Sequence, residues 1–191
     1  TAAVAAVEYT ADDYAFTAGS ADDQITTGSA NVNAGAGNDV ITTGKANSTI
    51  TGGAGSDTFV ITSTAVAGAK IADLGATDIL KVTAGVVAVD VVESFTATAA
   101  TTNASANVTL NLKDGVNVDM TLATLAAAGN GYTIDATAAV TTGATIVGSR
   151  GDDKITGSKF ADTITGGEGA DNITGGAGND IIILTESVSA I

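Results

Sequence analysis

Residues 148–156 read GSRGDDKIT, and three further units of nine residues follow without a gap: GSKFADTIT, GGEGADNIT and GGAGNDIII. Position six of the units is always aspartate, in turn Asp153, Asp162, Asp171 and Asp180, and position eight is always isoleucine. A fixed internal period of this kind indicates a stacked repeat architecture. Glycine allows tight turns with positive φ, and one apolar residue between two outward-facing ones suits a short strand. The stretch therefore predicts turns that alternate with short strands.

A second and less regular block of the same repeat precedes it. Its units are AGSADDQIT from residue 18, a shortened TGSANVN from 27, AGAGNDVIT from 34, TGKANSTIT from 43 and GGAGSDTFV from 52. Asp23, Asp39 and Asp57 occupy position six in the first, third and fifth units, whereas Asn31 and Ser48 lie nearest that place in the other two. One edge of this block is therefore acidic, and the edge with Asn31 and Ser48 is expected to form turns without metal.

If two units make one coil, residues 18 apart lie above one another at about 4.8 Å, the spacing of neighbouring strands. Bare carboxylates at that spacing repel, whereas a Ca²⁺ ion between them takes oxygen ligands at about 2.3–2.6 Å and completes its shell with turn carbonyls. The shortened unit brings Asp23 and Asp39 two positions closer in sequence but leaves both on the acidic edge. The stacked pairs expected from this arrangement are Asp23 with Asp39, Asp39 with Asp57, Asp153 with Asp171, and Asp162 with Asp180.

The pattern GGxGxDx(apolar)x resembles the RTX, or haemolysin-type, calcium-binding nonapeptide repeat, which GGEGADNIT and GGAGNDIII match fully. In that family the aspartates at position six and the turn carbonyls bind Ca²⁺ in a parallel β-roll. The resemblance thus implies several Ca²⁺ ions and a ligand role for Asp23, Asp39, Asp57, Asp153, Asp162, Asp171 and Asp180. Departures from the pattern are Ala34 at position one and Ala21 and Phe160 at position four. Asp13 is a weaker candidate ligand.

The chain is predicted to be all-β, with parallel β-roll (RTX β-solenoid) blocks on either side of a β-rich spacer and at most one short helix. The expected division is a lead-in at residues 1–17, a first block at 18–60, a spacer at 61–146, and a second block with its exit strand at 147–191.

Four local features are expected in the spacer. Residues 70–82, KIADLGATDILKV, predict strand, turn and strand, with Asp73 and Asp78 as turn formers that accept backbone amides, or alternatively as calcium ligands. NVTLNL and VNVDMTL alternate apolar and polar residues around Lys113-Asp114-Gly115, which indicates a hairpin. Residues 121–128 suggest a short helix and residues 132–136 a strand.

Composition restricts the function. The 191 residues include 21 acidic and 7 basic ones, a formal charge of −14, which disfavours nucleic acid and anionic membrane as partners. The chain has neither Cys nor His, which removes the commonest catalytic base and zinc ligand, so no enzyme active site is expected. No uncharged apolar stretch is long enough to cross a bilayer, so no membrane insertion is expected. No signal peptide is visible, and the chain is expected to be part of a longer protein.

These features favour a calcium-binding structural module of a secreted bacterial cell-surface protein. Thr, Ala, Val and Gly in an acidic chain resemble the RTX-containing S-layer proteins exported by type I systems, which fold and assemble with copies of themselves outside the cell. One alternative is the secretion and folding tail of an exported enzyme or toxin, whose catalytic part lies outside this chain. Another is a segment of a large adhesin. An ice-binding roll, suggested by Thr49-Ile50-Thr51 and Thr163-Ile164-Thr165, competes with the ordinary preference of threonine for strands.

Overall fold

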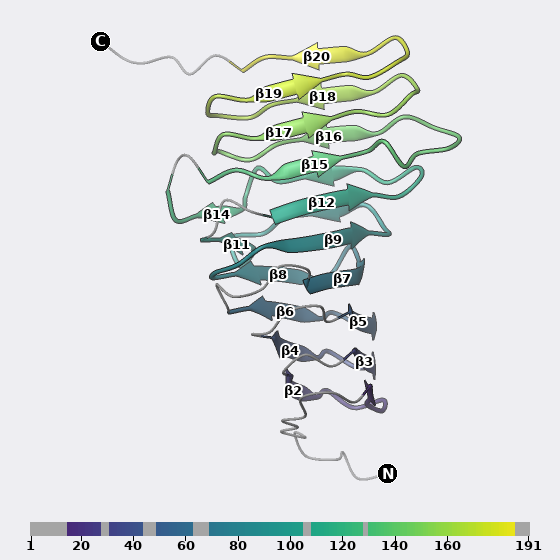
Figure 1. Ribbon diagram of the computed structural model, residues 1–191, viewed down its shortest axis with the longest axis vertical. Helices are drawn as coiled ribbons and strands as arrows, with labels where there is room; N and C mark the ends of the chain where they lie inside the picture. Colours follow the sequence, from purple (N-terminus) through teal and green to yellow (C-terminus); the bar gives the residue numbers. More distant parts are fainter. Residues whose placement is uncertain are drawn as a thin grey trace.

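The computed structural model describes residues 15–27, 31–43, 49–62, 69–104, 108–127 and 130–185. Within these ranges every regular element is a strand and every strand pair is parallel, as in a β-solenoid. The coils stack along the long axis, with the N-terminal coils at the bottom of Figure 1 and the C-terminal coils at the top. The described residues include no helix long and apolar enough to span a membrane. The all-β, β-roll prediction is confirmed.

Three sheets run along the stack, and in the described residues they contain nine, six and five strands. Sheet A follows the order β1 (Phe16–Thr17), β3 (Val32–Ala36), β5 (Thr49–Ala54), β7 (Ala69–Leu74), β9 (Val87–Val91), β12 (Val108–Leu112), β15 (Thr133–Asp135), β17 (Lys154–Thr156) and β19 (Asn172–Thr174). Sheet B contains β2 (Gln24–Thr27), β4 (Val40–Thr43), β6 (Thr58–Ile61), β8 (Ile79–Val82), β11 (Thr102–Asn103) and β14 (Thr124–Leu125). Sheet C contains β10 (Phe95–Thr96), β13 (Val118–Asp119), β16 (Thr145–Val147), β18 (Thr163–Thr165) and β20 (Ile181–Ile183).

Strand register confirms two units per coil in the repeat blocks. Ile155 pairs with Ile173 and Ile164 with Ile182, in each case two nonapeptide units later. The shortened unit also has the predicted effect, because Ile25 pairs with Ile41, which is nearer in sequence by the two positions that the short unit lacks. The nonapeptide period is therefore the half-coil of the solenoid.

Residues of the predicted spacer supply strands to all three sheets, and the coils there are larger. Between β9 and β12 the chain forms β10 and β11, so this coil has three strands, and Val87 pairs with Val108 of the next coil. The predicted hairpin is wrong. β12 pairs in parallel with β9 and β15, while β13 pairs with β10 and β16 in another sheet. The turn at Asp114 and Gly115 (φ 72°) carries the chain to the next side of the coil instead of reversing it.

The short helix predicted for residues 121–128 is also wrong within its described part, which forms a turn and β14. The backbone amides of Thr124 and Ala126 donate to carbonyls of the preceding coil, those of Thr101 and Asn103, at 2.8 and 3.1 Å. Pairing with a preformed strand therefore overrides the helix propensity of the alanines. The strand predicted at 132–136 is confirmed by β15, and the strand, turn and strand at 70–82 by β7 and β8.

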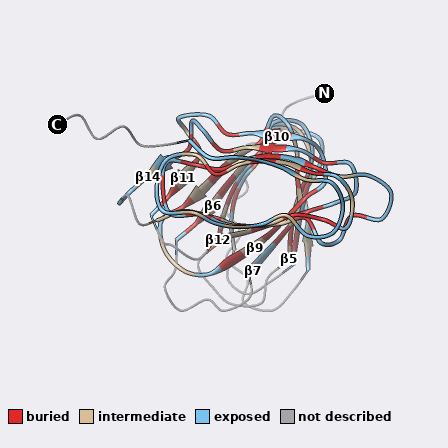
Figure 2. Cartoon of the chain, turned by 90° about the horizontal axis from the view of Figure 1, so that it is seen from above, coloured by how far each residue is buried: buried red, intermediate tan, exposed pale blue. Residues whose placement is uncertain are grey.

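Inward side chains of the three sheets form one continuous apolar core. In the view along the axis the coils superimpose as a flattened ring with buried residues along its walls (Figure 2). The two apolar rows expected on the predicted hairpin, 108–112 and 116–120, do face this core. Burial falls at the C-terminal end: Ile155 and Ile164 are fully buried, Ile173 is half-buried, and Ile182 is 45% exposed because no described coil covers it.

Candidate calcium site

The position-six aspartates form hydrogen-bonded ladders that run along the turns. In the first block the amide of Asp23 donates to Asp39 Oδ1 at 2.8 Å, and the amide of Asp39 donates to Asp57 Oδ1 at 2.9 Å. Two parallel ladders occupy the second block: the amide of Asp153 donates to Asp171 Oδ1, and that of Asp162 to Asp180 Oδ1, both at 3.0 Å. The structure thus brings together all four predicted pairs, on the expected edges.

Most of these carboxylates are buried, and for three of them burial disfavours the negative charge. Asp23, Asp39, Asp57, Asp153 and Asp162 are all at most 5% exposed. Burial raises the pKa of Asp57 to about 6, and the neighbouring carboxylates of Asp78 and Asp39 add to the shift. Burial likewise raises the pKa of Asp153 to about 6 and that of Asp39 above its ordinary value. A cation between the turns would relieve this penalty.

One carboxylate oxygen in the first block has no donor. Asp39 Oδ2 is buried without a hydrogen-bond partner among the described residues. In the second block the equivalent oxygens of Asp153 and Asp162 accept the amides of Ser149 and Ser158, at 2.6 and 2.7 Å. A buried carboxylate oxygen without a donor is satisfied by a proton, a water molecule or a cation, so the Asp39 turn has room in its chemistry for a metal ion.

The turns of successive coils stack backbone on backbone. A Cβ built on Gly53 would lie 2.0 Å from the Gly35 carbonyl oxygen, and one on Gly176 would lie 1.9 Å from that of Ser158. Both glycines have positive φ, so only glycine fits these places.

The donor chemistry fits Ca²⁺. Among the described residues, no group of three or more Asp or Glu side chains is placed to hold a metal ion together. An ion between two turns would therefore take one aspartate from each turn and complete its shell with carbonyl oxygens. A set made only of oxygen ligands, with several neutral carbonyls, is what Ca²⁺ prefers.

On the opposite edge of the first block, the side-chain amide of Asn31 takes the place that aspartate carboxylates have on the acidic edge. Asn31 Oδ1 accepts the amide of Thr49, one coil later, at 3.0 Å. Ser48, the other residue expected on this edge, lies outside the described residues, as does Asp13.

The ladder of the first block extends one step further than the repeats. The amide of Asp57 donates to Asp78 Oδ1 at 2.9 Å, which repeats the bond between Asp39 and Asp57. Asp78 Oδ2 accepts the amide of Gly75, and Asp73 accepts the amides of Gly52 and Gly53. The prediction of a turn former that accepts a nearby backbone amide is confirmed for Asp78, whereas Asp73 accepts amides of the preceding coil. The place of Asp78 in the ladder was missed, although Leu80 follows it at the spacing between positions six and eight.

Two serines are further partners that the repeat pattern did not reveal. Ser149 and Ser158 stand at position two, where the last two units have glycine. The Ser149 hydroxyl lies 3.1 and 3.0 Å from the carboxylate oxygens of Asp153, and the Ser158 hydroxyl lies 3.1 Å from both oxygens of Asp162. Each hydroxyl also accepts the amide at position four, from Gly151 or Phe160.

Comparison with known proteins agrees with this geometry. The family model described as RTX calcium-binding nonapeptide repeat (4 copies) matches residues 33–60 and 147–182, which include most of the stacked aspartates. No curated protein and no solved structure gives a match. These two segments, whose turns are glycine-rich and laddered by aspartate, are therefore similar to RTX calcium-binding nonapeptide repeats and lie within one β-solenoid.

Proposed function

We propose that the chain is a calcium-binding structural module of a secreted bacterial surface-layer protein, which folds and assembles outside the cell. The observation that supports it most is the buried ladder of carboxylates, Asp23 to Asp78 and Asp153 to Asp171, with its orphaned oxygen at Asp39. The ligand roles are assigned to Asp23, Asp39, Asp57, Asp153, Asp162, Asp171 and Asp180, and Asp78 is added as the last member of the first ladder.

A bound Ca²⁺ supplies positive charge and flexible oxygen coordination between successive turns. The protein supplies the spacing, because its strand register fixes each pair of aspartates one coil apart. Extracellular modules typically bind Ca²⁺ with Kd of about 10⁻⁴ to 10⁻³ M. At cytosolic calcium the turns would remain empty, and after export binding would add to the free energy of folding.

The stacked β-coils and the net charge of the chain support the surface-layer role. The regular elements of its described residues are all strands stacked in coils, its charge is −14, and cations are therefore its natural partners. Divalent ions that neutralise such a surface also favour contact between copies. A secretion tail or an adhesin segment would use the same turns but would remain dispersed.

Calcium titration of two matched variants tests the ligand assignment. Asp171→Asn removes a charged ligand while keeping the side-chain shape, and it should raise the calcium midpoint of folding about tenfold or more, as followed by circular dichroism. Asp135→Asn is the control, because Asp135 Oδ1 accepts the amide of Thr137 away from the ladders. An unchanged midpoint in Asp171→Asn would refute the assignment.

Electron microscopy of the purified chain tests assembly. Ordered sheets in millimolar calcium that disperse in chelator are the expected result. Dispersed single particles under both conditions would overturn the surface-layer role and favour a secretion tail or an adhesin segment.

A further inference from the structure

The C-terminal turns fall into two kinds. In the coil of residues 148–165, serine hydroxyls and amides satisfy Asp153 and Asp162 from within the same turn. In the next coil, residues 166–183, Gly167 and Gly176 replace the serines, with φ of 107° and 102°. The carboxylates of the lower coil thus accept hydrogen bonds from serines of their own turns, whereas the upper coil has glycines in place of those serines.

The lower coil is also tied to the coil beneath it. Asp153 Oδ1 accepts the amide of Tyr132, and Asp162 Oδ1 accepts the amide of Ala144, both at 2.6 Å. Neither of these positions carries an aspartate. The two ladders of the second block therefore begin at Asp153 and Asp162, whose lower neighbours are ordinary backbone donors.

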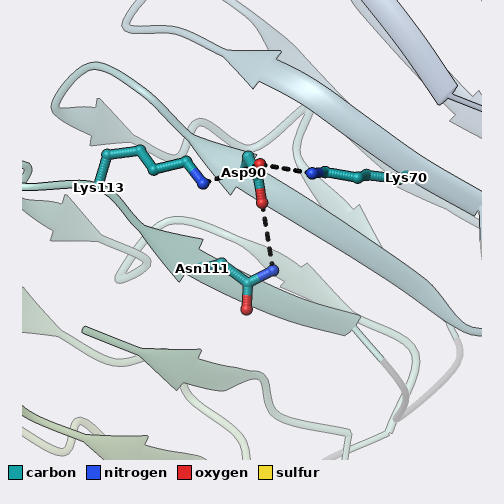
Figure 3. A network of polar contacts seen from close by, with 4 residues as sticks. All are labelled: Lys70, Asp90, Asn111 and Lys113. Atoms are coloured by element: carbon teal, nitrogen blue, oxygen red, sulfur yellow. Dashed lines mark hydrogen bonds and ion pairs between the residues drawn. The ribbon is translucent and has the colours of Figure 1, made fainter. Parts of the chain in front are cut away.

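Carboxylates of the central coils have donors of their own. Asp90 lies between Lys70 and Lys113, at 2.8 and 2.9 Å, with the amide of Asn111 at 3.4 Å (Figure 3). Although burial opposes its ionisation, the two ammonium groups hold the pKa of Asp90 below its ordinary value. Lys70 lies in β7 and Lys113 directly follows β12, the two strands on either side of β9. The ion pairs of Asp90 therefore connect three successive coils.

Three aspartates between β12 and β16, Asp114, Asp119 and Asp135, also have donors of their own. Asp114 accepts the amides of Val140, Thr141 and Thr142 and the hydroxyl of Thr141. Asp119 and Asp135 each accept the amide two residues later, at 2.9 and 2.8 Å. In the described part of the chain, none of these side chains stacks on another aspartate in the ladder manner.

Buried apolar side chains are concentrated in the central coils and are absent from the last described coil. The three-sided coils contribute large buried side chains such as Phe95, Leu110 and Met120. Among the described apolar side chains of the second block only Ile155 and Ile164, both in the serine coil, are fully buried, and residues 166–185 contribute no buried side chain. Burial of apolar area is the main favourable term in folding, so the last coil has the least to stabilise it.

We infer that the described coils from β9 to β18 fold without calcium, and that Ser149 and Ser158 are positioning residues that hold Asp153 and Asp162 as preformed half-sites. At this end of the solenoid, ion binding then orders the last coil, β19 and β20, on top of them. This inference rests on the proposed calcium binding and adds where in the chain that binding acts.

Hydrogen exchange of the whole chain, read by mass spectrometry in 5 mM CaCl₂ and in EGTA, tests the division. Peptides covering β9, β12, β15, β17 and β18 should remain protected in EGTA, and peptides covering β19 and β20 should lose at least about tenfold in protection. Loss of protection across β9 to β18 in EGTA, with recovery in calcium, would overturn this inference while leaving calcium binding intact. Identical exchange under both conditions would overturn the proposed calcium binding itself.

The double variant Ser149→Gly with Ser158→Gly tests the positioning role, since it converts both turns to the glycine form found in the upper coil. We expect protection of β17 and β18 to fall in EGTA, protection in saturating calcium to return, and the calcium midpoint to rise about fivefold. Ser94→Gly is the control, because Ser94 Oγ accepts the amide of Asn117 away from the aspartate ladders. A double variant that matches the parent in EGTA protection and in midpoint would refute the role.

Discussion

Alanine at Gly55 is expected to destabilise the N-terminal coils by about 3 kcal/mol, because two separate features exclude a side chain there. Gly55 has φ of 142°, a conformation that L-residues rarely adopt. Its Cβ would also lie 1.9 Å from the Gly37 carbonyl oxygen of the coil below. Backbone strain of this kind amounts to about 1–3 kcal/mol.

Relief of the collision requires the two turns to separate by more than about 1 Å, since a Cβ contact rarely falls below about 3 Å. That movement would break the neighbouring bond from the Gly37 amide to the Ala54 carbonyl, which is 2.9 Å long. A lost backbone hydrogen bond adds about 1 kcal/mol. Strain and the lost bond together give the expected effect of about 3 kcal/mol.

Thermal unfolding in saturating calcium measures the effect, and about 3 kcal/mol in a chain of this size corresponds to a decrease in Tm of about 6–12 °C. Gly19→Ala is a matched control in the same block, because no atom of the described part lies within 4 Å of its Cβ. Gly19→Ala should change Tm by less than about 2 °C. Equal effects of the two substitutions, or a parental Tm for Gly55→Ala, would refute the backbone-on-backbone account of the turns.

Three further predictions concern groups outside that contact. In EGTA, urea denaturation should show the protein to be more stable at pH 5 than at pH 7.5, by about 1.4 kcal/mol for each of Asp57 and Asp153, because burial raises the pKa of both to about 6. The stabilisation is complete below the ordinary pKa of 3.8 and is lost as the pH rises through 6, so a higher stability at pH 7.5 would contradict the prediction. Asp114→Asn should speed amide exchange at residues 140–142, whereas the control Asp119→Asn should leave that exchange unchanged. Because the Thr141 hydroxyl and nearby amides lower the pKa of Asp114 to about 2, the parent protein should keep this protection at pH 4 and lose it as the pH falls through 2. Tyr132→Phe should leave stability in urea unchanged or raise it by about 1 kcal/mol, because the phenol oxygen is buried without a partner in the described structure, and a clear loss of stability would mean that the hydroxyl is bonded.

The sequence predicted the repeat blocks well because their period is short and each unit carries its own turn and strand. The columns at positions six and eight of residues 148–183 were enough to place Asp171 above Asp153 and to fix one nonapeptide as the half-coil. Even the shorter separation of Asp23 and Asp39 followed from counting. In such a repeat the sequence of each unit specifies its turn and strand, and the constant length of the units specifies which strands pair.

The sequence could not decide how residues between the blocks pair. Alternation of apolar and polar residues in 108–120 predicted the buried rows correctly, yet the same alternation suits a hairpin or two parallel strands in different sheets. The choice depended on β9 and β15 as partners for β12, and partners from other coils are non-local. For the same reason the run at 121–127 forms a turn and the two-residue strand β14 beside β11.

For the candidate site, the sequence by itself determined which aspartates stack and that oxygen ligands are on offer. Only the tertiary structure decided that Asp78 joins the first ladder, that Ser149 and Ser158 close two of the turns, and that Asp39 Oδ2 is without a donor among the described residues. Each of these facts depends on where a hydrogen-bond donor sits in space relative to a carboxylate, within the same turn or one coil away. A repeating pattern fixes the spacing of coils, but the individual departures from it acquire their role only from the neighbours that the fold brings within a few ångströms.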